Sequence, residues 1–259
     1  LLQWIGGDLL QQIDSSAADS VDHTSTELSH RLANSALLPL FGYPSTVREL
    51  YYATPEHLPA DAVISRSLEM AISQFAPGGE TVKDKGLLTA VGVGVFKPGF
   101  PPKPAEGCGT EFLVVRCEDC TSLTMTENPD IEECAVCHSP AEVITCWEPD
   151  GFITDLEEPE DFLGSFDYMP RGTSTKLQSN RHPGSEPLAG TNIEFMGRSD
   201  EVMSINDNSS QLFHFVRTSK GFWVDPEEAK GSLHLGALQK DVFVNVALAG
   251  RKRTDILQM

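Results

Sequence analysis

Four cysteines stand in two short pairs, and this spacing constrains the fold more than any other feature of the chain. The pairs are Cys117-x-x-Cys120 and Cys134-x-x-Cys137, with thirteen residues between them. A Cys-x-x-Cys turn directs two thiolates to one point, and two such turns facing each other supply the four ligands of a tetrahedral zinc site. The sequence therefore predicts one zinc ion held by these four cysteines.

The segments beside the pairs predict the strands of a zinc ribbon. Residues 111–116 lead into the first turn and residues 141–146 leave the second, and both runs are rich in β-forming side chains. Four thiolates leave no open position for water, so the predicted zinc is structural and not catalytic. His138 follows Cys137 and carries a nitrogen that can bind zinc, but with four thiolates present we expect it beside the ligands or in solvent.

Two other uses of paired cysteines stay open at this point. The pairs are compatible with two disulfides in a secreted protein, although structural disulfides seldom come as paired Cys-x-x-Cys. A redox Cys-x-x-Cys normally occurs singly at the start of a helix. Cys108 and Cys146 lie outside the pattern, and we expect both to be free thiols.

Composition limits the class of protein. The 259 residues suffice for one large domain or two smaller ones, and no apolar run approaches the ~18 residues that span a bilayer. Without a signal peptide, we expect a cytoplasmic chain that contacts no membrane. The net charge of −19 argues against a surface that coats nucleic acid. The chain opens without Met inside an amphipathic pattern, so we expect a fragment of a longer protein or one piece of a split one.

The hydrophobic pattern predicts an α+β fold with N-terminal helices, a zinc ribbon with four cysteine ligands and a β-rich C-terminal half. We expect helices over 1–36 and 61–75, and a hairpin turn at 207–209. Strands are expected over 47–52, 89–95, 193–196, 202–206, 212–217, 222–224 and 242–249.

These elements predict four parts of the chain. Residues 1–58 form a helical connection to an upstream motor, and 59–163 form a helix plus the zinc-ribbon domain. Residues 164–190, rich in Ser, Gly, Pro and Arg, form a flexible loop. Residues 191–259 form a β-rich domain.

The sequence contains no recognisable catalytic motif. It lacks the Gly-x-x-x-x-Gly-Lys-Ser/Thr phosphate loop, the Gly-x-Ser-x-Gly nucleophile elbow and a Cys/His nucleophile pair. Gly92-x-Gly94 lacks a third glycine, which favours simple strand packing. We therefore expect no catalytic residue and no organic cofactor site in this chain.

Several segments together resemble one helicase family. The first is Arg66-x-Leu-Glu-x-Ala-Ile-Ser-Gln-Phe-Ala-Pro-Gly78, followed by Lys83-Asp-Lys85, the paired cysteines and Glu148-Pro-Asp-Gly-Phe-x-Thr-Asp155. The segments Leu38-Pro-Leu-Phe-Gly-Tyr-Pro-x-x-Val-Arg48 and Ile205-Asn-Asp-Asn208 agree with them. Over about Leu32 to Leu257, the chain resembles the C-terminal zinc-binding (MrfA/DrmA-type) region of large superfamily-two DNA helicases, most of all the DISARM anti-phage helicases of the DrmA type.

The resemblance implies ATP-driven DNA translocation by a parent helicase in anti-phage defence. It also implies that this chain is the zinc-bearing accessory region, because the motor that would bind ATP and Mg²⁺ is absent from it. The expected partners are DNA, reached through the parent helicase, a motor that lies upstream or on a separate polypeptide, and a DISARM-type partner subunit.

Under this helicase interpretation, basic residues are candidates for DNA phosphate contacts, which would give affinity independent of base sequence. The candidates are Arg48, Lys83, Lys85, Arg251 and Lys252. Each has an alternative in an acidic chain, namely a solvated position or an ion pair with a carboxylate. Trp147 and Phe152 are able to stack on a base, but we favour packing beside the ribbon for both.

Two functions from different classes follow. The first is an accessory region of an ATP-dependent DNA helicase that guides DNA or docks a partner subunit. The second is a protein-interaction scaffold that zinc stabilises and that makes no DNA contact.

Overall fold

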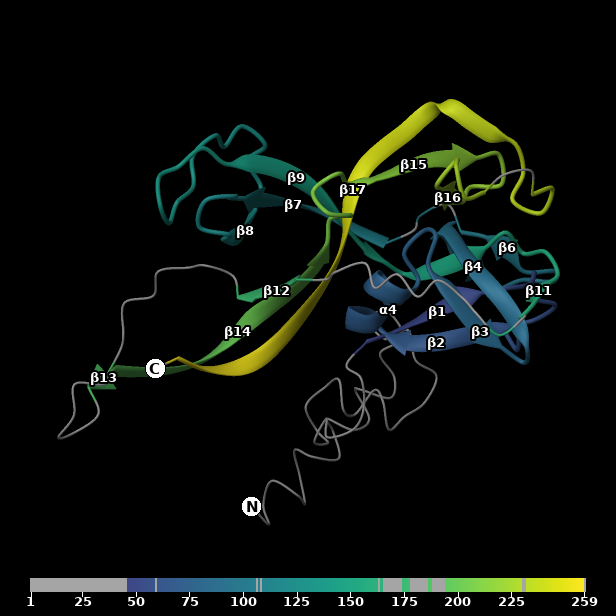
Figure 1. Cartoon of the computed structure of the whole chain (residues 1–259), viewed down its shortest axis with the longest axis horizontal. Helices are drawn as coiled ribbons and strands as arrows, with labels where there is room; N and C mark the ends of the chain where they lie inside the picture. The colour runs from purple at the N-terminus through teal and green to yellow at the C-terminus, as the bar shows by residue number, and fades with distance from the viewer. Residues whose placement is uncertain are drawn as a thin grey trace, which may run out of the picture. The chain divides into compact units, whose positions relative to one another are not determined.

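The computed structural model of the chain describes residues 46–58, 60–105, 107, 109–162, 164, 174–177, 186–187, 194–229 and 232–258. Contacts divide the chain into two units, Leu1–Val47 and Arg48–Met259, and the second holds almost all of these residues. In the described part the structure has seventeen strands and one helix, α4 (Leu68–Gln74) (Figure 1). The predicted α+β class is therefore wrong, because this part is mostly β-sheet. The helices expected over 1–36 lie outside the described residues.

The strands of the first half come in short runs. They are β1 (Val47–Tyr51), β2 (Val63–Ser67), β3 (Glu80–Lys83), β4 (Gly86–Val93), β5 (Phe96–Lys97), β6 (Lys103–Pro104), β7 (Gly109–Arg116), β8 (Leu123–Thr126), β9 (Glu142–Pro149) and β10 (Gly151–Thr154). The strands predicted over 47–52, 89–95, 111–116 and 141–146 are confirmed, with shifted ends.

The second half is also made of strands, two of them long. They are β11 (Glu160–Asp161), β12 (Ser174–Leu177), β13 (Glu186–Pro187), β14 (Glu194–Asn206), β15 (Phe213–Thr218), β16 (Trp223–Val224) and β17 (Leu238–Gln258). The main path of the large sheet runs β2-β1-β10-β4-β16-β15-β17-β9-β7-β8, and β5 and β6 form a separate two-stranded sheet.

The helix predicted over 61–75 is half wrong. Ile64, Leu68, Ile72 and Phe75 have helical spacing, but residues 63–67 form β2, and the helix begins only at Leu68. The β-branched pair Val63 and Ile64 favours the extended backbone. The helix ends before Phe75, where the following Pro-Gly stops it.

Strand β17 organises the C-terminal half, because it pairs with two strands in succession. β15 pairs antiparallel with its first part, from Thr218↔Leu238 to Phe213↔Val246. β14 pairs antiparallel with its second part, from Asn206↔Leu248 to Met196↔Gln258. β14 and β15 therefore run in the same direction along β17, which is the long yellow strand of Figure 1.

The hairpin turn predicted at 207–209 is therefore wrong. The segment Asp207-Asn208-Ser209 has turn composition, but residues 207–212 leave the ladder and return to it without reversing the chain. Asn208, Ser209, Ser210 and Leu212 all have positive φ, so this excursion is a left-handed turn inserted into one long ribbon.

The apolar core lies around helix α4 and the central strands. Phe75, Phe152 and Phe215 are completely buried there, and the Phe75 and Phe152 rings meet edge to face at 5.8 Å. Trp147 is 6% exposed and stacks on Phe215 at 5.9 Å. Trp147 and Phe152 are therefore packed side chains, but they belong to the core around helix α4, whereas the sequence predicted packing beside the ribbon.

Two glycines allow close approach inside this core. A Cβ at Gly92 would overlap the carbonyl of Trp223, and one at Gly94 would overlap the ring of Phe222. Gly92-x-Gly94 thus serves strand packing, as expected. No helix in the described part is long and apolar enough to cross a membrane.

Candidate metal centre

The four predicted cysteines converge on one point. The ligand sulfurs of Cys117, Cys120, Cys134 and Cys137 all lie within 4.8 Å of one another. The Cys117 and Cys137 sulfurs are 3.5 Å apart, and those of Cys120 and Cys134 are 3.6 Å apart. A tetrahedral metal with metal–sulfur bonds of about 2.3 Å has sulfur–sulfur edges of about 3.8 Å. The four cysteines are therefore positioned to hold one metal ion.

Two turns of the same design present these thiols. β7 ends at Arg116 directly before Cys117, and the backbone N–H of Cys117 donates to Ser122 O at 3.2 Å. In the second turn the N–H of Cys134 donates to Ser139 O at 2.8 Å. The residue after each pair, Thr121 or His138, has a φ of 56° or 63°. This left-handed residue lets the chain reverse after the second cysteine of each pair.

Hydrogen bonds around two of the four sulfurs, those of Cys134 and Cys137, favour the thiolate, which is the form that binds metal. The hydroxyl of Ser122 lies 3.2 Å from the sulfurs of both Cys120 and Cys134. This hydroxyl, together with the backbone N–H groups of Cys137 and Val136, lowers the pKa of Cys134 to about 6. Hydrogen bonds from Ser139 lower the pKa of Cys137 as well.

The other predicted cysteine and histidine positions fall outside the cluster. Cys146 is a free and fully buried thiol in β9, as expected. Cys108 lies outside the described residues. The ring of His138 is exposed, and its Nδ1 lies 2.7 Å from Glu133 Oε1, so His138 interacts with a surface carboxylate next to the thiols.

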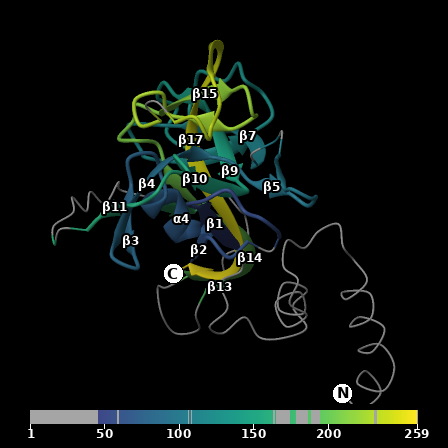
Figure 2. The same ribbon diagram turned by 90° about the vertical axis from the view of Figure 1, so that its right-hand side faces the viewer.

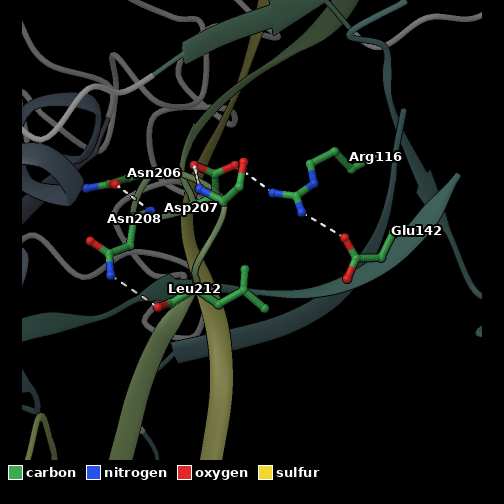
Figure 3. A network of polar contacts seen from close by, with 7 residues as sticks. Arg116, Glu142, Asn206, Asp207, Asn208 and Leu212 are labelled. Carbon is green, nitrogen blue, oxygen red and sulfur yellow. Dashed lines mark hydrogen bonds and ion pairs between the residues drawn. The ribbon is translucent and has the colours of Figure 1, made fainter. Parts of the chain in front are cut away.

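A polar network ties the metal-binding turns to the C-terminal ribbon (Figure 3). Arg116, the neighbour of Cys117, donates from NH1 to Asp207 Oδ2 at 2.8 Å and from NH2 to Glu142 Oε2 at 2.7 Å. Asn206, one residue before Asp207, is completely buried and donates from Nδ2 to Ile72 O at 2.7 Å. The excursion at 207–212 thus connects β7 on one side with helix α4 on the other.

Two of the predicted DNA-contact residues share one carboxylate. Arg48 is 7% exposed, its Nε donates to Pro149 O, and its guanidinium lies 3.6 Å from Glu148 Oε1. Arg251 donates from Nε to Glu148 Oε2 at 3.0 Å and covers the Phe112 ring at 4.6 Å. Burial lowers the pKa of Arg48, and the Glu148 charge opposes that shift. Glu148 therefore forms ion pairs with both arginines.

The three lysines among the predicted contacts lie at different places. Lys83 donates to Val63 O at 3.1 Å and lies over the Tyr52 ring at 4.7 Å. Asp84 and Lys85 form the two-residue turn of the β3–β4 hairpin, both with positive φ, and Lys85 is exposed. The Nζ of Lys252 lies 3.8 Å from Glu69 Oε1.

Sequence reasoning missed three residues that organise these contacts, namely Ser122, Glu148 and Asn206. Ser122 had a local signal, because it stands two residues after Cys120. Glu148 and Asn206 stood inside segments singled out for the family resemblance, but their partners lie 100 to 134 residues away in sequence.

The fold and the site define a β-rich protein with four thiols positioned to hold one metal ion. No protein-family model, no curated protein and no solved structure matches the chain. The resemblance to the helicase region stays a prediction.

Proposed function

We propose that the metal held by Cys117, Cys120, Cys134 and Cys137 is a structural zinc ion. Four sulfur donors at tetrahedral spacing are the donor set of structural zinc sites. Such a site is closed to water and substrate, so its contribution is to stabilise the fold. In this chain it holds together the two turns between β7 and β9, where side-chain burial is sparse.

We further propose that the chain is the accessory region of an ATP-dependent DNA helicase of the superfamily-two class. The segments that carry the resemblance are joined in space. Arg48, the last residue of the segment that begins at Leu38, contacts Glu148 and Pro149 of another segment. Asn206, from the Ile-Asn-Asp-Asn segment, contacts Ile72 in the helix segment. These contacts place residues from separate segments of the resemblance on one folded platform.

Within that role, docking of the motor or of a partner subunit is better supported than guiding DNA through the predicted cations. The observation that carries this choice is Glu148, which pairs with both Arg48 and Arg251. A guanidinium that is already paired contributes little net charge to a phosphate contact. A net charge of −19 also repels a polyanion from most of the surface.

The test uses the complete product of the gene that encodes this chain, together with the products of neighbouring genes. We expect a Walker-type ATPase on the same polypeptide, or on one that co-purifies with it, and DNA-stimulated ATP hydrolysis by the assembly. In the two-chain case, Cys120→Ser should abolish co-purification and Cys146→Ala, which changes a cysteine outside the metal site, should not. In the one-chain case, the same variants are compared for DNA-stimulated turnover.

A second function, an interaction scaffold without DNA, is favoured by the same pairing of Arg48 and Arg251. The two functions predict different partners. Co-purification of a protein without ATPase motifs, with no ATPase on the chain itself, would support the scaffold and exclude the helicase role.

A further inference from the structure

The β5–β6 hairpin carries an aromatic side chain that faces solvent. The arm runs from Phe96 to Pro104 and closes with the pairs Phe96↔Pro104 and Lys97↔Lys103. Phe100, near its tip, is 96% exposed, more than any other large apolar side chain in the described part. Figure 2 shows the β5 hairpin extending away from the neighbouring strands.

The base of the arm is fixed in the core. Phe96 is 7% exposed, and its ring lies 5.2 Å from the Tyr51 ring and 5.6 Å from the Phe222 ring. Below it, the backbone N–H of Ala105 donates to Val95 O at 2.8 Å. Four of the nine residues of the arm are proline, and each proline fixes its own φ. Phe100 is thus held in solvent by an anchored and stiff segment.

The arm is basic although the chain is acidic. Phe96-Lys-Pro-Gly-Phe-Pro-Pro-Lys-Pro104 contains two lysines and no acid, whereas the whole chain has a net charge of −19. Lys97 and Lys103 are both exposed and stand directly opposite each other. Like charges at opposed positions destabilise a strand pair. An anion bound by both ammonium groups would relieve that repulsion.

We propose that this arm binds single-stranded DNA. Phe100 stacks on the face of an unpaired base, and Lys97 and Lys103 pair with the adjacent phosphates. A base face that is free to stack is available in a single strand and covered in a duplex. A stable protein–protein interface of standard size buries about 800 Å² on each partner, and an arm of nine residues with one exposed aromatic ring is small for such an interface. The proposal goes beyond the docking role and does not depend on it.

The experiment measures the affinity of the full chain for a short fluorescein-labelled oligo(dT) by fluorescence anisotropy, over a series of salt concentrations. We expect Phe100→Ala to weaken binding roughly 5- to 100-fold, the loss typical of one stacked base, and Phe100→Trp to keep the affinity. The double variant Lys97→Gln/Lys103→Gln should reduce the slope of log K against log salt by about 1.4, because each phosphate contact contributes about 0.7 on single strands.

Matched controls lie on β17. Phe243 is 54% exposed and Lys240 is exposed, so Phe243→Ala and Lys240→Gln remove the same groups elsewhere and should leave affinity and slope unchanged. All six residue changes lie at the surface, and equal zinc content and melting temperature would show that each variant folds.

Three results would overturn the proposal. The first is the absence of oligo(dT) binding at low salt. The second is equal affinity of the Phe100→Ala and Phe243→Ala variants for oligo(dT). The third is a Phe100→Ala variant that keeps its affinity for oligo(dT) and loses only the capture of a protein partner. A negative result for DNA binding by the arm would not refute the docking role, because docking is measured by co-purification and ATPase activity without oligo(dT).

Discussion

The metal-binding turns and the apolar core are stabilised in different ways. From Glu127 to Pro140 the only buried residue is Cys134. In the core, by contrast, helix α4 and the central strands bury complete aromatic side chains, among them Phe75, Phe152 and Phe215. A segment of the first kind buries too little apolar surface to offset its own conformational entropy. A segment of the second kind needs no metal.

Because of this difference, we expect each region to be able to lose its structure while the other stays folded. Loss of the metal should loosen the turns while the core stays folded, and a cavity in the core should lower global stability while the thiols still bind metal. β9 joins the two regions, since it pairs with β7 in the turn region and with β17 in the main sheet.

Loss of a ligand should have the largest effect. Cys120→Ser should release the metal and unfold residues 117–141, because binding free energy at such a site is also folding free energy, on the order of 10 kcal/mol in small zinc peptides. Zinc content by mass spectrometry and circular dichroism would measure this, with Cys146→Ala as the control. One equivalent of zinc on the Cys120→Ser protein, at unchanged stability, would refute the site.

A cavity in the core should come next. Phe152→Ala removes a ring that is 0% exposed, and Phe→Ala changes at such sites cost about 3–5 kcal/mol. Urea unfolding followed by tryptophan fluorescence measures the loss. The comparison predicts that zinc content stays at one per chain, and a loss of zinc in the folded variant would contradict it.

The link between the two regions should matter less. Asn206→Ala removes the bond from Nδ2 to Ile72 O and leaves that carbonyl without its side-chain donor, at a cost of about 1–3 kcal/mol. Asn245→Ala is a milder control, because the Asn245 side chain is exposed and its Oδ1 contacts His214 Nδ1 at the surface, at 2.9 Å. Equal losses of unfolding free energy in the two variants would contradict the assigned role of Asn206.

Near neutral pH the smallest effect should be the titration of Cys146, which changes stability only above pH 9. Burial raises the pKa of this thiol from 9.0 to about 12, so above pH 9 the unfolded chain loses the proton and the folded chain keeps it. Its contribution to stability is complete below pH 9 and falls as pH rises toward about 12. Cys146→Ala should therefore show a shallower alkaline loss of unfolding free energy. Parallel pH profiles for the two proteins would disprove the shift.

Much of the metal site could be predicted from the sequence, because its ligands lie in two local turns with a defined spacing. The strands beside the turns were equally local, since residues 111–116 and 141–146 are rich in β-branched and other β-forming side chains. Packing of Trp147 and Phe152 could be predicted from their aromatic side chains, but the core that receives them, around helix α4, could not.

The errors came from contacts that are distant in sequence. Residues 61–75 satisfy a helical period and still begin as β2, because their neighbour β1 offers a strand pairing that no local pattern reveals. Residues 207–209 do form a turn, as their composition indicates. The sequence did not reveal that β14 and β15 on either side of it both pair with one strand, β17. The pairing of Glu148 with Arg48 and Arg251 crosses about a hundred residues, so the sequence left an ion pair open for each arginine but could not identify the carboxylate.

Hydrogen–deuterium exchange on the zinc-loaded chain, with and without a chelator, tests the central claim most directly. We predict that chelation releases one zinc ion per chain and accelerates amide exchange in residues 117–141. Exchange in α4, β4 and β10 should stay as it was. Uniform acceleration over the whole chain, or no change in residues 117–141 after the metal has left, would contradict the account.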